Sequence, residues 1–184
     1  MNMVSVLVGD RGTGKTTYLK KLIPIYLAKG MKVLIIDTLA HDAYVDIPII
    51  SIAQLPAWKK GVYRLIIPSY EFNEAIAQVK EHVWNALIVV EDAYKVIKRK
   101  LPKEVEEYII DTKQKNVDMI FMYHSWGWVM KDLITIADCF QLFKTGDHPS
   151  YRKEAMAGCY PQVERAYNKV MQSKNPYETI SILK

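Results

Sequence analysis

The residues with the clearest chemical purpose stand near the start of the chain. A segment there matches the phosphate-binding pattern G-x-x-x-x-G-K-[ST] without a mismatch, between an apolar run and a helical pattern. Its glycines let the backbone curl so that N–H groups point at a triphosphate. We expect Lys15 to reach the β- and γ-phosphates and Thr16 to hold Mg²⁺, with ATP as the ligand. The full segment is Gly9, Asp10, Arg11, Gly12, Thr13, Gly14, Lys15, Thr16 and Thr17.

Two acids follow the most hydrophobic predicted strand, in residues 86–92. In ATPases with such a loop, one carboxylate at this place binds Mg²⁺ through water and a neighbour orients the attacking water. We therefore expect Glu91 and Asp92 to be catalytic, with Glu91 also a metal ligand. The usual order is Asp then Glu, and the shorter Asp92 reaches less far toward a γ-phosphate. A pair of solvated acids at a strand end is the alternative.

A histidine ends a further predicted strand, in residues 119–124. If this strand lies between the loop strand and the acid strand, His124 is placed to sense the γ-phosphate, and we count it among the catalytic residues. The alternative is a hydrogen-bonded histidine of the surface or core.

A basic segment follows the acid strand. Residues 95–103 contain five basic residues and no acid. Contacts between such side chains and phosphates give affinity without sequence preference. The expected DNA contacts are Lys95, Lys98, Arg99 and Lys100. A solvated lysine-rich loop, balanced by three glutamates one turn onward, is the alternative.

Apolar runs and helical patterns alternate along the chain, which predicts an α/β fold with a mainly parallel sheet flanked by helices. Two apolar runs, residues 47–52 and 63–67, are expected as short strands. Ser69 is expected to cap a helix whose apolar face includes Phe72, Ile76 and Val79. The other predicted strands are residues 3–8, 31–37, 86–92, 119–124, 139–143 and 177–183, and predicted helices include 128–137 and 162–172.

The length of 184 residues predicts one domain, 1–184, with a core of about 1–147 and a C-terminal helix and strand in 148–184. The formal net charge of +5 is compatible with a polyanionic partner. Cys139 and Cys159 are expected to be buried free thiols. No apolar run approaches the roughly 20 residues of a membrane span, and the chain enters a strand at once. We therefore expect a cytoplasmic protein without a membrane segment.

These segments, in their order, resemble the FtsK–HerA group of P-loop motors, and within it they are most similar to small viral DNA-packaging ATPases. The resemblance covers roughly residues 1–150 and rests on residues 9–17, 86–92, 119–125 and 140–147. It implies a P-loop NTPase fold of the RecA-like, ASCE type. It further implies a homo-oligomeric ring that hydrolyses ATP and translocates double-stranded DNA, at a portal or capsid vertex, in the host cytoplasm or on the virion.

The chain departs from that family in one respect. Members tend to carry a finger arginine shortly before the fourth strand, where residues 111–118 here have lysines only. Either a lysine, Lys113 or Lys115, takes this role, or Arg99, Arg152 or Arg165 does, or hydrolysis is slow.

Other functions remain open. A P-loop nucleotide kinase needs an arginine-lined lid, and this chain has five arginines in all. A filamentous-phage assembly ATPase of the zonular occludens toxin type implies a membrane segment. An ATP-bound interaction module needs no hydrolysis. A dinucleotide-binding oxidoreductase is excluded by the glycine spacing.

Overall fold

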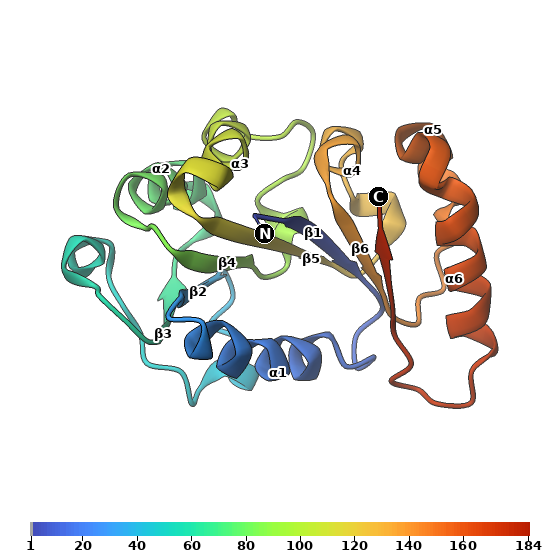
Figure 1. Cartoon of the computed structure of the whole chain (residues 1–184), viewed down its shortest axis with the longest axis horizontal. Helices are drawn as coiled ribbons and strands as arrows, with labels where there is room; N and C mark the ends of the chain where they lie inside the picture. The colour runs from blue at the N-terminus through green and yellow to red at the C-terminus, as the bar shows by residue number, and fades with distance from the viewer. Residues whose placement is uncertain (1) are drawn as a thin grey trace.

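A single seven-stranded sheet forms the centre of the computed structural model, which describes residues 2–184. Its strand order is β3-β2-β4-β5-β1-β6-β7, and all neighbours pair in parallel except β6 and β7. Helix α1 covers one face of the sheet, and α2, α3 and α4 cover the other (Figure 1). The predicted α/β fold with a mainly parallel sheet is confirmed.

The strands are β1 Val4–Val8, β2 Lys32–Asp37, β3 Val62–Ile66, β4 Ala86–Val90, β5 Val117–Tyr123, β6 Cys139–Leu142 and β7 Ile180–Leu183. The α-helices are α1 Lys15–Ala28, α2 Phe72–His82, α3 Lys103–Lys115, α4 Lys131–Ile136, α5 Lys153–Met156 and α6 Tyr160–Gln172. Short 3₁₀ turns are η1 Asp42–Tyr44, η2 Ile52–Ala57, η3 Ser69–Glu71, η4 Ala93–Lys95, η5 Trp126–Trp128, η6 Pro149–Arg152 and η7 Ala157–Cys159.

The apolar strands fill a core on each side of the sheet. Every residue of β2, β4 and β5 is buried, as expected for parallel strands covered on both faces. Alternation along β1 sends Val6 and Val8 into the larger cluster, under α2, α3 and α4, and Leu7 into the smaller cluster, under α1.

The strand order gathers the chemical groups at one edge. Strand β5 lies between β1 and β4, as expected for the strand that ends at His124. Val8 pairs with Tyr123, and Val90 pairs with Phe121. Because the strands are parallel, the loop after β1, the acids after β4 and His124 after β5 emerge at the same edge.

Two expectations from the sequence were wrong. Residues 47–52 form no ladder, only an isolated bridge between Ile49 and Arg64, because Pro48 lacks an N–H and the chain turns into η2. Ser69 does not cap α2: it begins the turn η3, and Glu71 occupies the N-cap position. The predicted buried face of α2, with Phe72, Ile76 and Val79, is confirmed.

The C-terminal elements extend the same sheet. Helix α6 buries one face, formed by Tyr160, Val163, Ala166 and Val170, and β7 pairs with β6. Strand β7 is shorter than predicted, because residues 173–179 form a turn in front of it. Both cysteines are buried and free, as expected. Within residues 2–184, no helix has both the length and the apolar character required to cross a membrane.

Candidate functional site

The loop between β1 and α1 uses its glycines in two ways. Gly12 and Gly14 have φ of 76° and 97°, values that side chains disfavour, and α1 begins directly after Gly14. Gly9 instead allows close packing, since a β-carbon there would clash with Cβ of Phe143. The loop therefore depends on Gly9 for its contact with the chain after β6, and on Gly12 and Gly14 for its curl.

Lys15 is buried and lies along its own loop. Its Nζ donates to the carbonyl oxygens of Gly9, at 2.5 Å, and Asp10, at 2.9 Å, and lies 3.1 Å from Nδ1 of His124. Burial lowers the pKa of Lys15 to about 8, although the carboxylates of Glu91 and Asp92 act in the opposite direction. The Lys15 ammonium group is therefore held between the loop backbone and His124.

Glu91 is fixed by a tyrosine that the sequence patterns do not reveal. The hydroxyl of Tyr44, which is fully buried, donates to Oε2 of Glu91 at 2.7 Å. Burial raises the pKa of Glu91, against the effect of this hydrogen bond. The carboxyl group is therefore held in one orientation, away from bulk water.

Asp92 and His124 form a pair. Asp92 adopts a left-handed conformation, with φ 47°, which turns the chain from β4 into η4. Nε2 of His124 lies 2.7 Å from Oδ1 of Asp92. A lysine ammonium can only donate, so Nδ1 of His124 accepts from Lys15 and Nε2–H donates to Asp92. Burial acts to raise the pKa of Asp92, but the hydrogen bond and charge of His124, together with the charges of Lys95 and Arg11, outweigh it, and the pKa is lowered.

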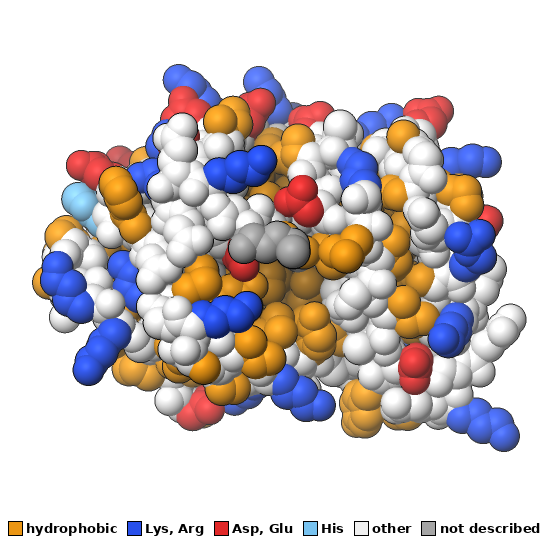
Figure 2. Space-filling view, in the orientation of Figure 1, with side chains coloured by type: hydrophobic (Ala, Val, Ile, Leu, Met, Phe, Trp, Pro, Cys, Tyr) orange, Lys and Arg blue, Asp and Glu red, His pale blue; other side chains and the backbone are white. Residues whose placement is uncertain are grey.

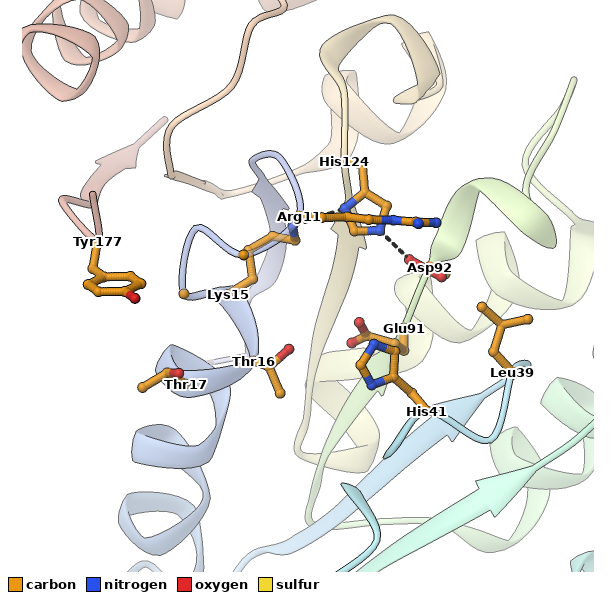
Figure 3. A pocket seen from close by; sticks show the side chains of 12 residues that line it. Arg11, Lys15, Thr16, Thr17, Leu39, His41, Glu91, Asp92, His124 and Tyr177 are labelled. Atoms are coloured by element: carbon orange, nitrogen blue, oxygen red, sulfur yellow. Dashed lines mark hydrogen bonds and ion pairs between the residues drawn. The ribbon is translucent and has the colours of Figure 1, made fainter. Parts of the chain in front are cut away.

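These groups line one cavity of about 570 Å³, shown in Figure 3. The structure therefore brings together the phosphate-loop pattern, the acid pair and His124, which the sequence places far apart. The lining residues are Arg11, Gly12, Gly14, Lys15, Thr16, Thr17, Leu39, His41, Glu91, Asp92, His124 and Tyr177.

Two residues of the predicted loop have other partners. The Asp10 carboxylate accepts from Thr145 Oγ1, at 3.2 Å, and from the Gly146 N–H, at 2.9 Å. Thr13 Oγ1 donates to the Asp10 carbonyl oxygen at 2.7 Å. Asp10 and Thr13 thus shape the loop and attach it to the segment after β6.

The segment after β2 supplies cavity residues that the sequence did not predict. The Asp37 carboxylate accepts from the N–H groups of Leu39, at 2.9 Å, and His41, at 2.8 Å, and Arg64 donates to the His41 carbonyl at 3.0 Å. The one sequence signal was the acid at the carboxyl end of an apolar strand. Tyr177, from the C-terminal turn, had no local signal at all.

The predicted DNA contacts differ in how exposed their side chains are. Lys98, Arg99 and Lys100 are exposed between η4 and α3, flanked by the buried Ile97 and Leu101. Lys95 is half-buried, with its Nζ 5.8 Å from the ring centre of Tyr94. On the face shown in Figure 2, lysine and arginine side chains are scattered over the surface and along its outline, with no single large basic patch. The three consecutive exposed cations are therefore a local feature.

Comparisons with known proteins give the fold a class. None of the curated proteins matches the chain. A family model described as MobB, molybdopterin guanine dinucleotide synthesis protein B, matches residues 4–51, which hold β1, the loop, α1 and β2. This match spans less than half of the chain.

Solved structures match over nearly the whole length. The genome packaging NTPase B204 from Sulfolobus turreted icosahedral virus 2, in complex with AMPPCP, is 18% identical with a TM-score of 0.76, covering 99% of this chain and 92% of that one. B204, the DNA-packaging ATPase from Sulfolobus turreted icosahedral virus, is 15% identical with a TM-score of 0.71, covering 100% and 94%. VirB4 of Thermoanaerobacter pseudethanolicus is 10% identical with a TM-score of 0.60, covering 100% and 89%.

At these identities the likeness establishes the fold. The chain has a P-loop NTPase fold, with a seven-stranded, mostly parallel sheet flanked by helices. The predicted RecA-like, ASCE arrangement, with a strand between the loop strand and the acid strand, is confirmed.

Proposed function

We propose that this chain is a Mg²⁺-dependent ATPase of the FtsK–HerA type that translocates double-stranded DNA during viral genome packaging. The observation that carries the proposal is the convergence of Lys15, the acid pair and His124 on the cavity above the loop. A loop that only bound phosphate would need neither two carboxylates nor a histidine at this place.

The loop and Lys15 bind the triphosphate. Backbone N–H groups from Gly12 to Thr16 face the phosphates, and Lys15 leaves the loop carbonyls to pair with the β- and γ-phosphates. Mg²⁺ fits the oxygens that line the cavity, the Thr16 hydroxyl and the Glu91 carboxylate, since this ion takes one or two carboxylates and keeps several waters. When bound, Mg²⁺ neutralises charge on the β- and γ-phosphate oxygens.

Asp92 and His124 handle the attacking water and the γ-phosphate. Asp92, whose pKa is lowered, accepts a hydrogen bond from the water and orients it. His124 is held by Lys15 on one nitrogen and by Asp92 on the other. When Lys15 moves to the phosphates, Nδ1 of His124 loses that donor and becomes free to accept a hydrogen bond from the water beside the γ-phosphate. The hydrogen bonding of His124, which also contacts Asp92, thus depends on whether a nucleotide is bound.

The DNA-translocating role rests on three supports. The fold matches proteins described as a genome packaging NTPase and a DNA-packaging ATPase along almost their full length. The net charge is +5, and Lys98, Arg99 and Lys100 are exposed shortly after the acid strand.

We further propose that the whole chain acts as one ATPase domain, in a homo-oligomeric ring docked to a portal or capsid vertex. The pairing of β7 with β6 supports the single domain.

Replacing Lys15 tests the site. Lys15→Ala should lower the rate of ATP hydrolysis by at least about a hundredfold and should weaken nucleotide binding. The reason is that the γ-phosphate loses its buried cation. Phosphate release and calorimetric ATP binding measure the two effects. Lys21→Ala, an exposed lysine of the same helix, is the matched control. Hydrolysis at the wild-type rate in Lys15→Ala would show that the site is wrong.

A further inference from the structure

Tyr177 belongs to the cavity but has no part in the chemistry described above. It lies in the C-terminal turn between α6 and β7, far from the loop in sequence, yet it lines the same cavity as Gly14 and Thr17. In Figure 3 its ring stands on the opposite side of the loop from Glu91, Asp92 and His124.

The ring rests on the loop backbone. A β-carbon built on Gly14 would lie 3.2 Å from Cδ1 of Tyr177, so the ring packs closely over this glycine. The residue nevertheless remains 62% exposed. One part of the ring is therefore supported by the loop, while the rest is open to a ligand.

The turn that carries Tyr177 is well anchored. The Tyr177 N–H donates to Oδ1 of Asn175 at 3.0 Å, and Lys144 Nζ, just after β6, donates to the Ser173 carbonyl oxygen at 2.5 Å. Thr179 Oγ1 donates to the Leu142 carbonyl oxygen at 2.6 Å. Bonds on both sides of Tyr177 thus tie the turn to the end of β6, beside the loop. An aromatic ring held this way loses little freedom when a ligand binds.

The direction in which the nucleotide lies across the loop determines which part of it contacts the Tyr177 ring. The γ-phosphate must lie toward Glu91 and Asp92, because those carboxylates serve the metal and the attacking water. The nucleoside must then leave the loop on the other side, where Thr17 and Tyr177 line the cavity.

We propose that Tyr177 is the platform on which the nucleobase stacks, an inference that rests on the proposed ATP site. Stacking on an aromatic ring uses the π-face, which every base has, and reads no base edge. The contact therefore selects nucleoside triphosphates over inorganic polyphosphates, and it contributes similarly for adenine and guanine.

The test compares ATP with inorganic tripolyphosphate, which carries the phosphates without a base. Binding of each to the full chain, with Mg²⁺, is measured by calorimetry. Tyr177→Ala should weaken ATP binding roughly tenfold and GTP binding to a similar extent, and leave tripolyphosphate binding within about twofold. Tyr177→Phe should retain the wild-type affinities. Tyr70→Ala, which removes an exposed tyrosine that does not line the cavity, is the control.

The outcomes separate this inference from the proposed function. Unchanged ATP affinity in Tyr177→Ala, while tripolyphosphate still binds the wild type, would overturn the stacking role alone. An equal loss for both ligands would mean that Tyr177 only supports the Gly14 backbone, and would also overturn it. If neither ATP nor tripolyphosphate binds the wild type, the ATP site itself is wrong and the stacking role falls with it.

Discussion

At the scale of single residues, the two adjacent acids have different surroundings. Glu91 is held by the Tyr44 hydroxyl and its pKa is raised, whereas Asp92 is paired with His124 and its pKa is lowered. Carboxyls whose environments push their pKa values apart commonly have separate tasks. The different surroundings support the proposed division of roles, in which Glu91 serves the metal and Asp92 the water.

Isosteric amides test this division. Glu91→Gln should weaken Mg²⁺-dependent ATP binding by about tenfold or more, because a charged oxygen ligand is removed. Asp92→Asn should leave ATP binding within about threefold but slow hydrolysis by about a hundredfold or more, so that bound ATP is trapped. Asparagine tolerates the left-handed conformation at position 92, so the turn should survive.

Binding and single-turnover hydrolysis, measured on the same preparations, distinguish the two variants. If Asp92→Asn lost Mg²⁺-dependent binding while Glu91→Gln kept it, the assignment would have to be reversed. Wild-type turnover in both variants would remove the pair from the mechanism.

At the scale of elements, local patterns and long-range contacts were not equally predictable. The strand, loop and helix around Lys15 follow from the sequence, because glycine spacing and apolar runs act locally. The contact of Tyr44 with Glu91 and the place of Tyr177 in the cavity do not, since both depend on chain folding that no local pattern records. The failure at residues 47–52 has a local cause: Pro48 cannot donate to a ladder, so apolar residues there pack as an irregular edge.

The basic turn between η4 and α3 carries the DNA-binding prediction at this scale. Replacing Lys98, Arg99 and Lys100 with alanine should weaken binding to double-stranded DNA of any sequence. For every DNA phosphate that is no longer neutralised by a side chain, the slope of log affinity against log salt should become shallower by about 0.9. Fluorescence anisotropy across a salt series measures both. Basal ATP hydrolysis should survive, unless Arg99 also acts as the finger.

A variant matched in charge gives the control. Alanines at Lys21, Lys29 and Lys169, which are exposed on α1, at its end and on α6, remove the same three charges elsewhere. This control should lose much less affinity than the turn variant. Equal losses of DNA affinity in the two variants would mean that only net charge matters. An unchanged salt slope in the turn variant would show that the turn does not contact DNA.

At the scale of the whole molecule, the site is expected to need a neighbouring subunit. Arg152 donates to carbonyl oxygens of Gly127 and Val129, and Lys115 lies over the Trp84 ring, 4.4 Å from its centre. Among the finger candidates, Arg99, Lys113 and Arg165 are the exposed ones. A finger supplied in trans stabilises charge on the transferring phosphoryl group.

Turnover per subunit should therefore rise with protein concentration as rings assemble. Alanine at one of the three exposed candidates should lower hydrolysis by about a thousandfold without changing nucleotide affinity. Phosphate release across a dilution series, with sedimentation velocity on the same samples, checks this. Constant turnover per subunit down to the monomeric range would exclude a shared site.

The most direct measurement of the central claim is ATP turnover with and without long double-stranded DNA, on wild type and Lys15→Ala in parallel. A DNA-translocating ATPase whose site is the cavity above the loop should hydrolyse ATP faster when long DNA is added, and Lys15→Ala should stay inactive in both conditions. A wild-type turnover rate that does not change with DNA of any length, or that equals the rate of Lys15→Ala, would contradict the account.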